Sequence, residues 1–288
     1  MQKIKLMINY FFVSAVAISY LFGIVIAKAA GNKVNYLSIL AGLLIFSGLY
    51  LLQVLQRFFT SNKVNPFTRV RAGSQNQSMT ALVIMIGAFL AVFCGLFLLL
   101  RAQVLIGTNL LLITTMSLLM VMSFGRFSRQ WFDSLSWFFE GLIVAPLMFL
   151  LGSAIQEYQF SYLLFVLWIP IFTLYSASAI MLLFAEYDLN KTTRAGSFIT
   201  LAGWEKALKF HHGLIILTYL SLLSYLIISG SWSQNWPALA LSLMSGVESY
   251  LLEQMAAGMR PNWLLMKTLA IVQFFSLIYL LAYPLFIG

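Results

Sequence analysis

Apolar stretches of about twenty residues alternate with short polar connections along the whole chain. A run of that length, wound as a helix, crosses a hydrocarbon core about 30 Å thick. Backbone groups in lipid must be paired within the protein, and these runs lack the alternation of barrel strands, so helices are expected. The pattern predicts nine spanning helices, at about 8–27, 36–56, 79–100, 103–123, 136–155, 160–185, 212–230, 237–256 and 264–286.

Composition supports a single integral membrane domain over residues 1–288. The chain is 61% hydrophobic and only 9% charged, whereas about a quarter of the residues of a soluble protein are charged. Its one cysteine, Cys94, lies inside an apolar run, which excludes an internal disulfide and a thiolate zinc site. The first apolar stretch follows basic residues, as in a signal peptide. It is too long for one and lacks a clear cleavage site, so we expect a retained first helix.

Positive charge is divided unevenly between the connections. With the N-terminus in the cytosol, the outer segments hold only Lys28, Lys33 and Arg101. The inner segments hold the other Lys and Arg residues: Lys3, Lys5, Arg57, Lys63, Arg69, Arg71, Arg126, Arg129, Lys191, Arg194, Lys206, Lys209, Arg260 and Lys267. Because positive loops stay in the cytosol, this predicts an N-in, C-out protein of a bacterial-type inner membrane. The net charge of +9 is then explained by membrane insertion and by contact with anionic lipid headgroups. No nucleic-acid partner is expected.

Two of the predicted inner connections are longer than the others, at about 57–78 and 186–211. Long ordered connections in compact folds tend to carry function. The first has four basic residues and no acidic one, and the second holds three of the eight acidic residues of the chain. We therefore expect the chemistry of this protein in these two cytosolic loops.

Both loops contain recognisable segments. The second reads EYDLNKTTRAG, with Asp188, Lys191, Arg194 and Gly196, and continues into TLAGWEKALKFH. The first reads RFFTSNKVNPFTRVRAGSQNQSM, with Asn65 ahead of a basic run. These segments resemble the two aspartate-rich motifs of the UbiA superfamily of intramembrane prenyltransferases, with TLAGWEKALKFH in the place of a short helix. The resemblance covers most of the chain, including the fifth apolar stretch, and implies a nine-helix UbiA-like bundle.

Members of this family transfer a prenyl group from an isoprenoid diphosphate to an acceptor, and their aspartates hold Mg²⁺ on the diphosphate. Mg²⁺ prefers oxygen ligands and neutralises charge that develops on a leaving diphosphate. The resemblance therefore implies a prenyltransferase that uses a polyprenyl diphosphate and an aromatic or lipid acceptor, with Mg²⁺ as the implied cofactor.

The carboxylates of such a site are mostly missing. The chain has two aspartates, Asp133 and Asp188, and no acidic residue precedes Asp133. Asn62 stands in the place of the last aspartate of the first motif, and Thr192 stands where the second motif has one. Two hypotheses stay open: a divergent prenyltransferase, or a catalytically inactive protein of the same fold that binds lipid or serves as a scaffold or partner subunit. A small-solute transporter would need a clear repeat and broken helices at the membrane midplane, and the sequence indicates neither.

Asp188, the candidate catalytic residue, forms with Glu186 the best remaining site for a metal or a diphosphate. Its structural alternative is an interfacial turn in which Asp188 caps the next helical turn. Loop bases match phosphate oxygens, so the candidate diphosphate-binding residues are Lys63, Arg69, Arg71, Lys191 and Arg194. Each base is also explained by positive-inside topology alone. One alternative is that these bases contact the diphosphate directly and replace the metal bridge. Another is that the neutral oxygens of Asn62, Asn65 and Thr192 replace the missing aspartates.

Few other polar residues fall in the apolar stretches. A carboxylate at mid-membrane costs about 2.5–3.5 kcal/mol, so Glu248 is expected to face the bundle interior, in an interhelical hydrogen bond, a polar cavity or a proton-coupled role. Glu253 is expected near the inner surface, and Glu140 in helix contacts. His211 and His212, at the start of the seventh predicted helix, lack partners at ligand spacing and indicate a metal site only weakly.

Overall fold

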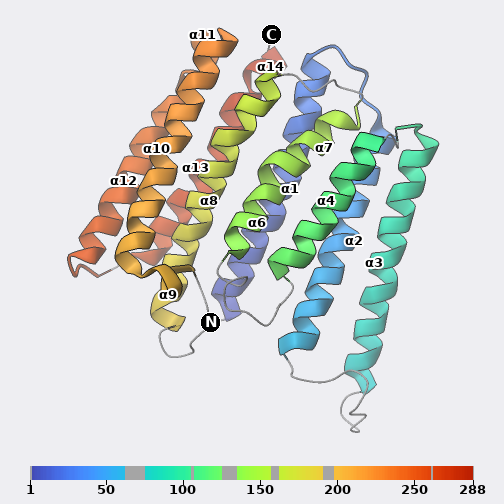
Figure 1. Cartoon of the computed structure of the whole chain (residues 1–288), viewed down its shortest axis with the longest axis horizontal. Helices are drawn as coiled ribbons and strands as arrows, with labels where there is room; N and C mark the ends of the chain where they lie inside the picture. The colour runs from blue at the N-terminus through green and yellow to red at the C-terminus, as the bar shows by residue number, and fades with distance from the viewer. Residues whose placement is uncertain are drawn as a thin grey trace.

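The computed structural model describes residues 2–61, 75–104, 107–124, 135–156, 162–190, 198–260 and 262–287. Within these ranges the chain is a bundle of helices lying side by side, without strands (Figure 1). The long segments are α1 (Gln2–Ala29), α2 (Tyr36–Ser61), α3 (Gln75–Arg101), α4 (Gly107–Phe124), the consecutive α6 (Ser136–Leu142), η1 (Ile143–Leu147) and α7 (Met148–Ala154), α8 (Tyr162–Asn190), α10 (Trp204–Ser229), α12 (Pro237–Ala256) and α13 (Trp263–Ala282). The short helices are α9 (Phe198–Ala202), α11 (Trp232–Asn235) and α14 (Pro284–Ile287). In this described part, each of the nine predicted ranges corresponds to a long helical segment.

Six of the described segments are long and apolar enough to cross a membrane: Tyr10–Ala29, Leu82–Arg101, Ser136–Ala154, Val166–Ala185, Trp204–Ser229 and Trp263–Ala282. The apolar parts described for α2 and α4 are shorter, Tyr36–Leu51 and Gly107–Leu119. Large apolar side chains on the outer faces of α3 and α10, among them Phe93 and Ile216, are exposed as lipid-facing residues are. The chain is therefore an integral membrane protein, while nine crossings and the N-in orientation stay predictions.

Successive long helices run in opposite directions, so their ends gather at two ends of the bundle (Figure 1). We call them the α9 end and the α11 end, after the short helices found there. At the α9 end, α2, α8 and α12 finish and α3 and α10 begin. The helix ends that flank the two predicted motif loops thus lie at the same end of the bundle.

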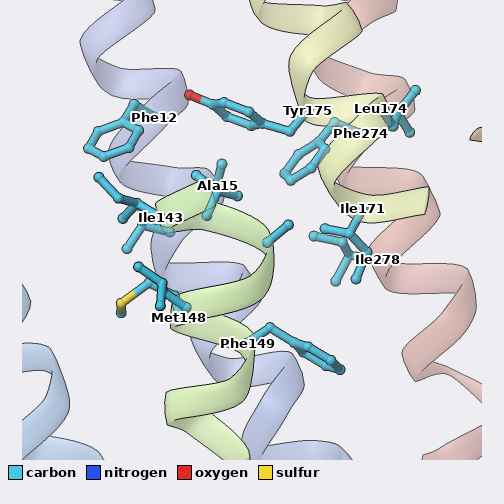
Figure 2. Close-up of a cluster of buried hydrophobic side chains, with 14 of the residues drawn as sticks. Phe12, Ala15, Ile143, Met148, Phe149, Ile171, Leu174, Tyr175, Phe274 and Ile278 are labelled. Carbon is cyan, nitrogen blue, oxygen red and sulfur yellow. The ribbon is translucent and has the colours of Figure 1, made fainter. Parts of the chain in front are cut away.

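The core lies where α1, α8, α13 and the α6–α7 segment meet. Phe11 of α1 stacks on Tyr175 of α8, with ring centroids 5.2 Å apart. Phe274 of α13 lies edge-on to both rings, with centroids 5.6 Å from each. Figure 2 shows Tyr175 extending from α8 toward α1, with Ile143 and Met148 lining the neighbouring part of the cluster. Close packing of aromatic and branched side chains fills the space between these four segments.

Two glycines let α1 and α7 approach each other closely. A Cβ on Gly23 would meet the carbonyl oxygen of Phe149 and lie 2.9 Å from the amide nitrogen of Ser153. A Cβ on Gly152 would meet the carbonyl oxygen of Tyr20 and lie 3.4 Å from the Cα of Gly23. Small residues at helix crossings permit this backbone contact in membranes, where dispersion rather than the hydrophobic effect drives association.

The α6–α7 segment is one span interrupted by a π-helical turn, η1. Pro146 lies in this turn and lacks the backbone N–H that an α-helix would need at that position. A wider turn removes the clash between the proline ring and the preceding carbonyl, so the helix continues through it.

Candidate functional site

The α9 end carries the acidic residues of the second predicted motif. Helix α8 continues to Asn190 instead of ending at the predicted residue 185, so Glu186 and Asp188 belong to its last turns. Helices also extend into both ends of the predicted 57–78 and 186–211 loops. The side chains of Glu186 and Asp188 lie outside what the structure describes. Outside the described residues altogether are Asn62, Lys63, Asn65, Arg69, Arg71, Lys191, Thr192 and Arg194, so their convergence with Asp188 stays a prediction.

An aromatic contact fixes the end of α8 against the start of α10. The indole of Trp204 lies edge-on to Phe184, with centroids 4.6 Å apart, and 5.8 Å from the ring of Tyr187. Ile199 of α9 is fully buried beside this junction. The last turns of α8, which include Asp188, are therefore held by packed neighbours.

Gly203 makes the turn from α9 into α10 with φ 83° and ψ 154°. This backbone region is essentially restricted to glycine, and a side chain there costs about 1–3 kcal/mol. We expect Gly203→Ala to lower the free energy of unfolding by about 1–2 kcal/mol, measured as thermal unfolding in detergent. Gly213→Ala is the matched control, because Gly213 lies within α10 with open space around its Cα. Equal stability of the two variants would contradict the strained turn.

A second polar site lies inside the bundle, between α10 and α12. His211 Nε2 is 3.3 Å from Glu248 Oε1, and the two side chains are 0% and 1% exposed. This confirms that Glu248 faces the interior and makes an interhelical hydrogen bond. The predicted position of His211 at the start of the seventh helix was wrong. α10 begins at Trp204 rather than at 212, so His211 lies about two turns inside the helix.

The charged stretch before His211 is part of α10 and not a separate short helix as the resemblance implied. Lys209 Nζ donates to Glu205 Oε1 at 2.8 Å, one turn apart on the exposed face. Ala207 and His211 lie on the buried face of the same turns. The helical spacing of Ala207, His211, Leu214 and Thr218 is the sequence signal that could have identified this face.

Two further titratable groups lie beside the buried pair, and one of them, Glu253, is in the last turn of α12 at the α9 end. His212 Nδ1 is 3.9 Å from Glu253 Oε1, and their side chains are 23% and 64% exposed. The rings of His211 and His212 have centroids 5.8 Å apart. Among the described residues, no group of three or more His, Cys, Asp or Glu is arranged to hold a metal ion. The chemistry available here is proton exchange and hydrogen bonding.

Deeper in the bundle, a hydrogen-bonded triad joins three helices. Tyr219 Oη is 2.9 Å from Ser245 Oγ, and Gln273 Nε2 donates to Tyr219 Oη at 2.8 Å and also to Ser245 Oγ. Thr218 donates to Thr173 of α8 at 2.8 Å. Sequence reasoning missed these contacts, because serine, threonine and tyrosine occur in many membrane helices without partners across the interface.

Glu140 joins α6 to α8. Tyr175 Oη donates to Glu140 Oε2 at 3.3 Å, and both side chains are buried. The contact matches the expected role of Glu140 in helix contacts.

A hollow of about 690 Å³ lies at the α11 end, around the connection between α1 and α2. Its polar lining includes Asn32, Lys33 and Gln156. Gln156 shapes it by accepting hydrogen bonds from Asn35 N at 2.7 Å and from Asn32 Nδ2 at 3.0 Å. This hollow is at the end of the bundle opposite Asp188, away from the predicted motif loops.

The described residues thus bring Glu248 together with His211, and Glu253 with His212, while the motif residues around Asp188 are placed only by the backbone of α8. Comparison of the chain with protein-family profiles, curated proteins and solved structures found no match.

Proposed function

We propose that this chain is a divergent membrane prenyltransferase of the UbiA type, which binds a polyprenyl diphosphate at the α9 end. The observation that carries the proposal is the position of Glu186 and Asp188 in the last turns of α8, at the end where the flanks of the basic first loop also lie. A diphosphate headgroup there would sit at the membrane edge, with its prenyl chain directed into the bundle.

Helix electrostatics supports a ligand at this position. The C-terminal end of a helix carries partial negative charge, so acidic residues in the last turn are unfavourable unless cations compensate. The last turn of α8 has no basic residue, and Lys191 and Arg194 follow directly in the sequence. Carboxylates held in an unfavourable place, beside bases suited to phosphate, are what a cation-bridged diphosphate site requires.

Mg²⁺ fits this helix end only in part. Glu186 and Asp188 are two positions apart, and side chains with that spacing do not face each other on a helix. One ion held by Asp188 and by diphosphate oxygens agrees with the ligand preference of Mg²⁺, but a two-metal site does not. When bound, such an ion would neutralise charge on the diphosphate. Asp188 would orient the headgroup, and the loop bases would hold its remaining oxygens.

In the transfer, the bond between the first prenyl carbon and the diphosphate oxygen breaks, and the diphosphate leaves with the electron pair. The acceptor forms a bond to the same carbon and loses a proton. The chain supplies cationic stabilisation of the leaving group, the contribution that typically dominates such transfers.

The test is release of inorganic diphosphate from farnesyl and geranylgeranyl diphosphates by the full chain in nanodiscs, with and without Mg²⁺. We expect Asp188→Asn to lower the release by about 100-fold or more. Glu205→Gln is the control, because Glu205 is an exposed carboxylate at the same end of the bundle, paired with Lys209 and outside the proposed site, and we expect it to retain release. Equal effects of the two variants would refute a specific role for Asp188.

The filled core favours a second candidate, a catalytically inactive protein of the same fold that binds lipid or a partner subunit. Phe11, Tyr175 and Phe274 occupy the space between α1, α8 and α13, where a buried prenyl chain would otherwise lie. Figure 2 shows Tyr175 and Phe274 of this group. For this candidate we expect farnesyl diphosphate to raise the unfolding temperature without any release of diphosphate. Neither binding nor release with any donor would reject the prenyltransferase and the lipid-binding form of the second candidate, and would leave its partner-subunit form.

A further inference from the structure

We infer that Glu253, His212, His211 and Glu248 form a proton path, which leads from the α9 end to a proton-binding carboxylate inside the bundle. The inference does not depend on prenyl transfer. It rests on the order of four titratable side chains along the interface of α10 and α12.

The exposed fraction of the side chains falls from the entrance of this path to its interior. Glu253 is 64% exposed, His212 is 23% exposed, and His211 and Glu248 are at 0% and 1%. The carboxylate of Glu253 and the ring of His212 are 3.9 Å apart at their nearest polar atoms, and the His211–Glu248 contact is 3.3 Å. A proton that enters from water therefore meets progressively more buried groups.

The two histidine rings supply the middle of the path. His211 Nδ1 and His212 Nε2 are buried and have no hydrogen-bond partner among the described residues. The two rings are in edge-to-face contact, with centroids 5.8 Å apart, so a proton passes between them when a small ring movement admits one water molecule to both nitrogens. Imidazole both accepts and donates a proton, so each ring can pass a proton from one nitrogen to the other side.

The transfer is balanced without any co-reactant. A proton from water binds His212, which passes one to His211 Nδ1 through the bridging water. His211 then gives its Nε2 proton to Glu248 Oε1 and returns to the neutral ring. Glu248 becomes a neutral carboxylic acid, which its position inside a membrane favours. The net change is one proton moved from water to Glu248.

Other titratable groups surround the path on the neighbouring helices. Lys267, near the start of α13 at the α9 end, is buried and interacts with other residues. The other titratable side chains that the structure describes on these helices are Glu205, Lys206, Lys209, Tyr219 and Tyr225 of α10, Tyr250 of α12, Tyr279 of α13, and Tyr175 and Tyr187 of α8. Glu186 and Asp188 also belong to α8, and their side chains are outside that description. α9 and α11 contribute no titratable side chain. Of all the titratable side chains described in this region, the four path residues are the ones that lead from an exposed position to buried ones between α10 and α12.

A purely structural His211–Glu248 pair would join two helices and need no connection to water. The continuation through His212 to exposed Glu253, and the unpartnered nitrogens of the two adjacent rings, distinguish a path from a static contact. The two interpretations differ in one measurable property, the rate at which Glu248 exchanges its proton with the α9 end.

The experiment is infrared difference spectroscopy of the full chain in nanodiscs, after a rapid drop in pH and with H₂O replaced by D₂O. We expect a carbonyl band of a buried carboxylic acid that appears on acidification, shifts in D₂O and is absent from Glu248→Gln. Glu205→Gln is the control, because Glu205 is an exposed carboxylate at the same end outside the path. It should leave the band unchanged.

His212→Leu provides the test of the route, because it removes one ring and keeps the buried pair. We expect the band to appear about tenfold more slowly, or slower still, in this variant. Glu253→Gln should slow it less, since Glu253 is the solvated entrance. A band that does not respond to pH in the parent chain would overturn the inference. So would an unchanged rate in His212→Leu, which stays informative even if Glu248→Gln fails to fold.

Discussion

Replacing Gly152 by alanine is expected to lower the free energy of unfolding by about 2–3 kcal/mol, the upper part of the range for overpacking. The added Cβ would meet the backbone of Tyr20 in α1, and a backbone carbonyl cannot move aside as a flexible side chain can. The only relief is a wider separation of α1 and α7. That separation loosens the helix that also carries Phe11 into the core.

The measurement is thermal unfolding of the detergent-solubilised protein, followed by tryptophan fluorescence. Gly87→Ala is the matched control, because Gly87 faces open space in α3 and should change stability by less than about 0.5 kcal/mol. Gly23→Ala should act like Gly152→Ala. The double variant should cost less than the sum, because one separation of the two helices relieves both clashes. Additive effects would show that the two glycines do not share one crossing.

Removing His211 while keeping Glu248 has the largest expected effect of the changes considered. In His211→Leu, the carboxyl of Glu248 stays buried without its partner, and breaking a buried pair in this way costs about 3–5 kcal/mol. We expect a loss of about 3 kcal/mol, because Glu248 can take up a proton and avoid a bare charge. The unfolding midpoint in detergent, compared with the parent chain, gives the value.

A double-mutant cycle isolates the pair from its surroundings. His211→Leu combined with Glu248→Leu should regain most of the loss, because apolar replacement of both members of a buried pair is often neutral. Glu253→Gln, at an exposed position on the same helix, should change stability by less than about 0.5 kcal/mol. If the double variant is as unstable as His211→Leu, the contact between the two side chains does not explain the loss.

The long helices were predictable because each one needs little information beyond its own sequence. A segment such as 237–256 is mostly apolar, starts with Pro237 and ends two residues before Gly258, and the structure gives the same bounds. The start and the end of such a helix do not depend on which helix lies beside it. Existence and approximate length therefore follow from hydrophobicity alone.

The start of α10 could not be predicted in the same way, because its first two turns mix two environments. Glu205, Lys206 and Lys209 indicate water, whereas Ala207 and His211 face the interior. A hydropathy window averages the two faces and places the helix start eight residues too late, at 212 instead of 204. Helical periodicity separates the faces, and it would have moved His211 from the membrane surface to the interior.

The contact of His211 with Glu248 required knowledge that a single sequence does not hold. Which turn of α10 meets which turn of α12 depends on how both helices pack against α8 and α13. The sequence did indicate that Glu248 needs an interior partner, since a lone carboxylate in a membrane is costly. Around Asp188, by contrast, the structure describes the backbone of α8 but not the side chains of the predicted site.

The meeting of α1 with α7 and α13 has a consequence for synthesis of the protein. α2 and α3 can pair as soon as both have left the ribosome, since each is the main neighbour of the other along the chain. α1 emerges first, yet Phe11 finds its last ring partner only when α13 is made. At roughly 5–20 residues per second, that delay is on the order of 10–50 s. During it, the first helix must wait in the bilayer without its final neighbours, so chains stopped before α13 would present an unfinished surface to membrane proteases and chaperones.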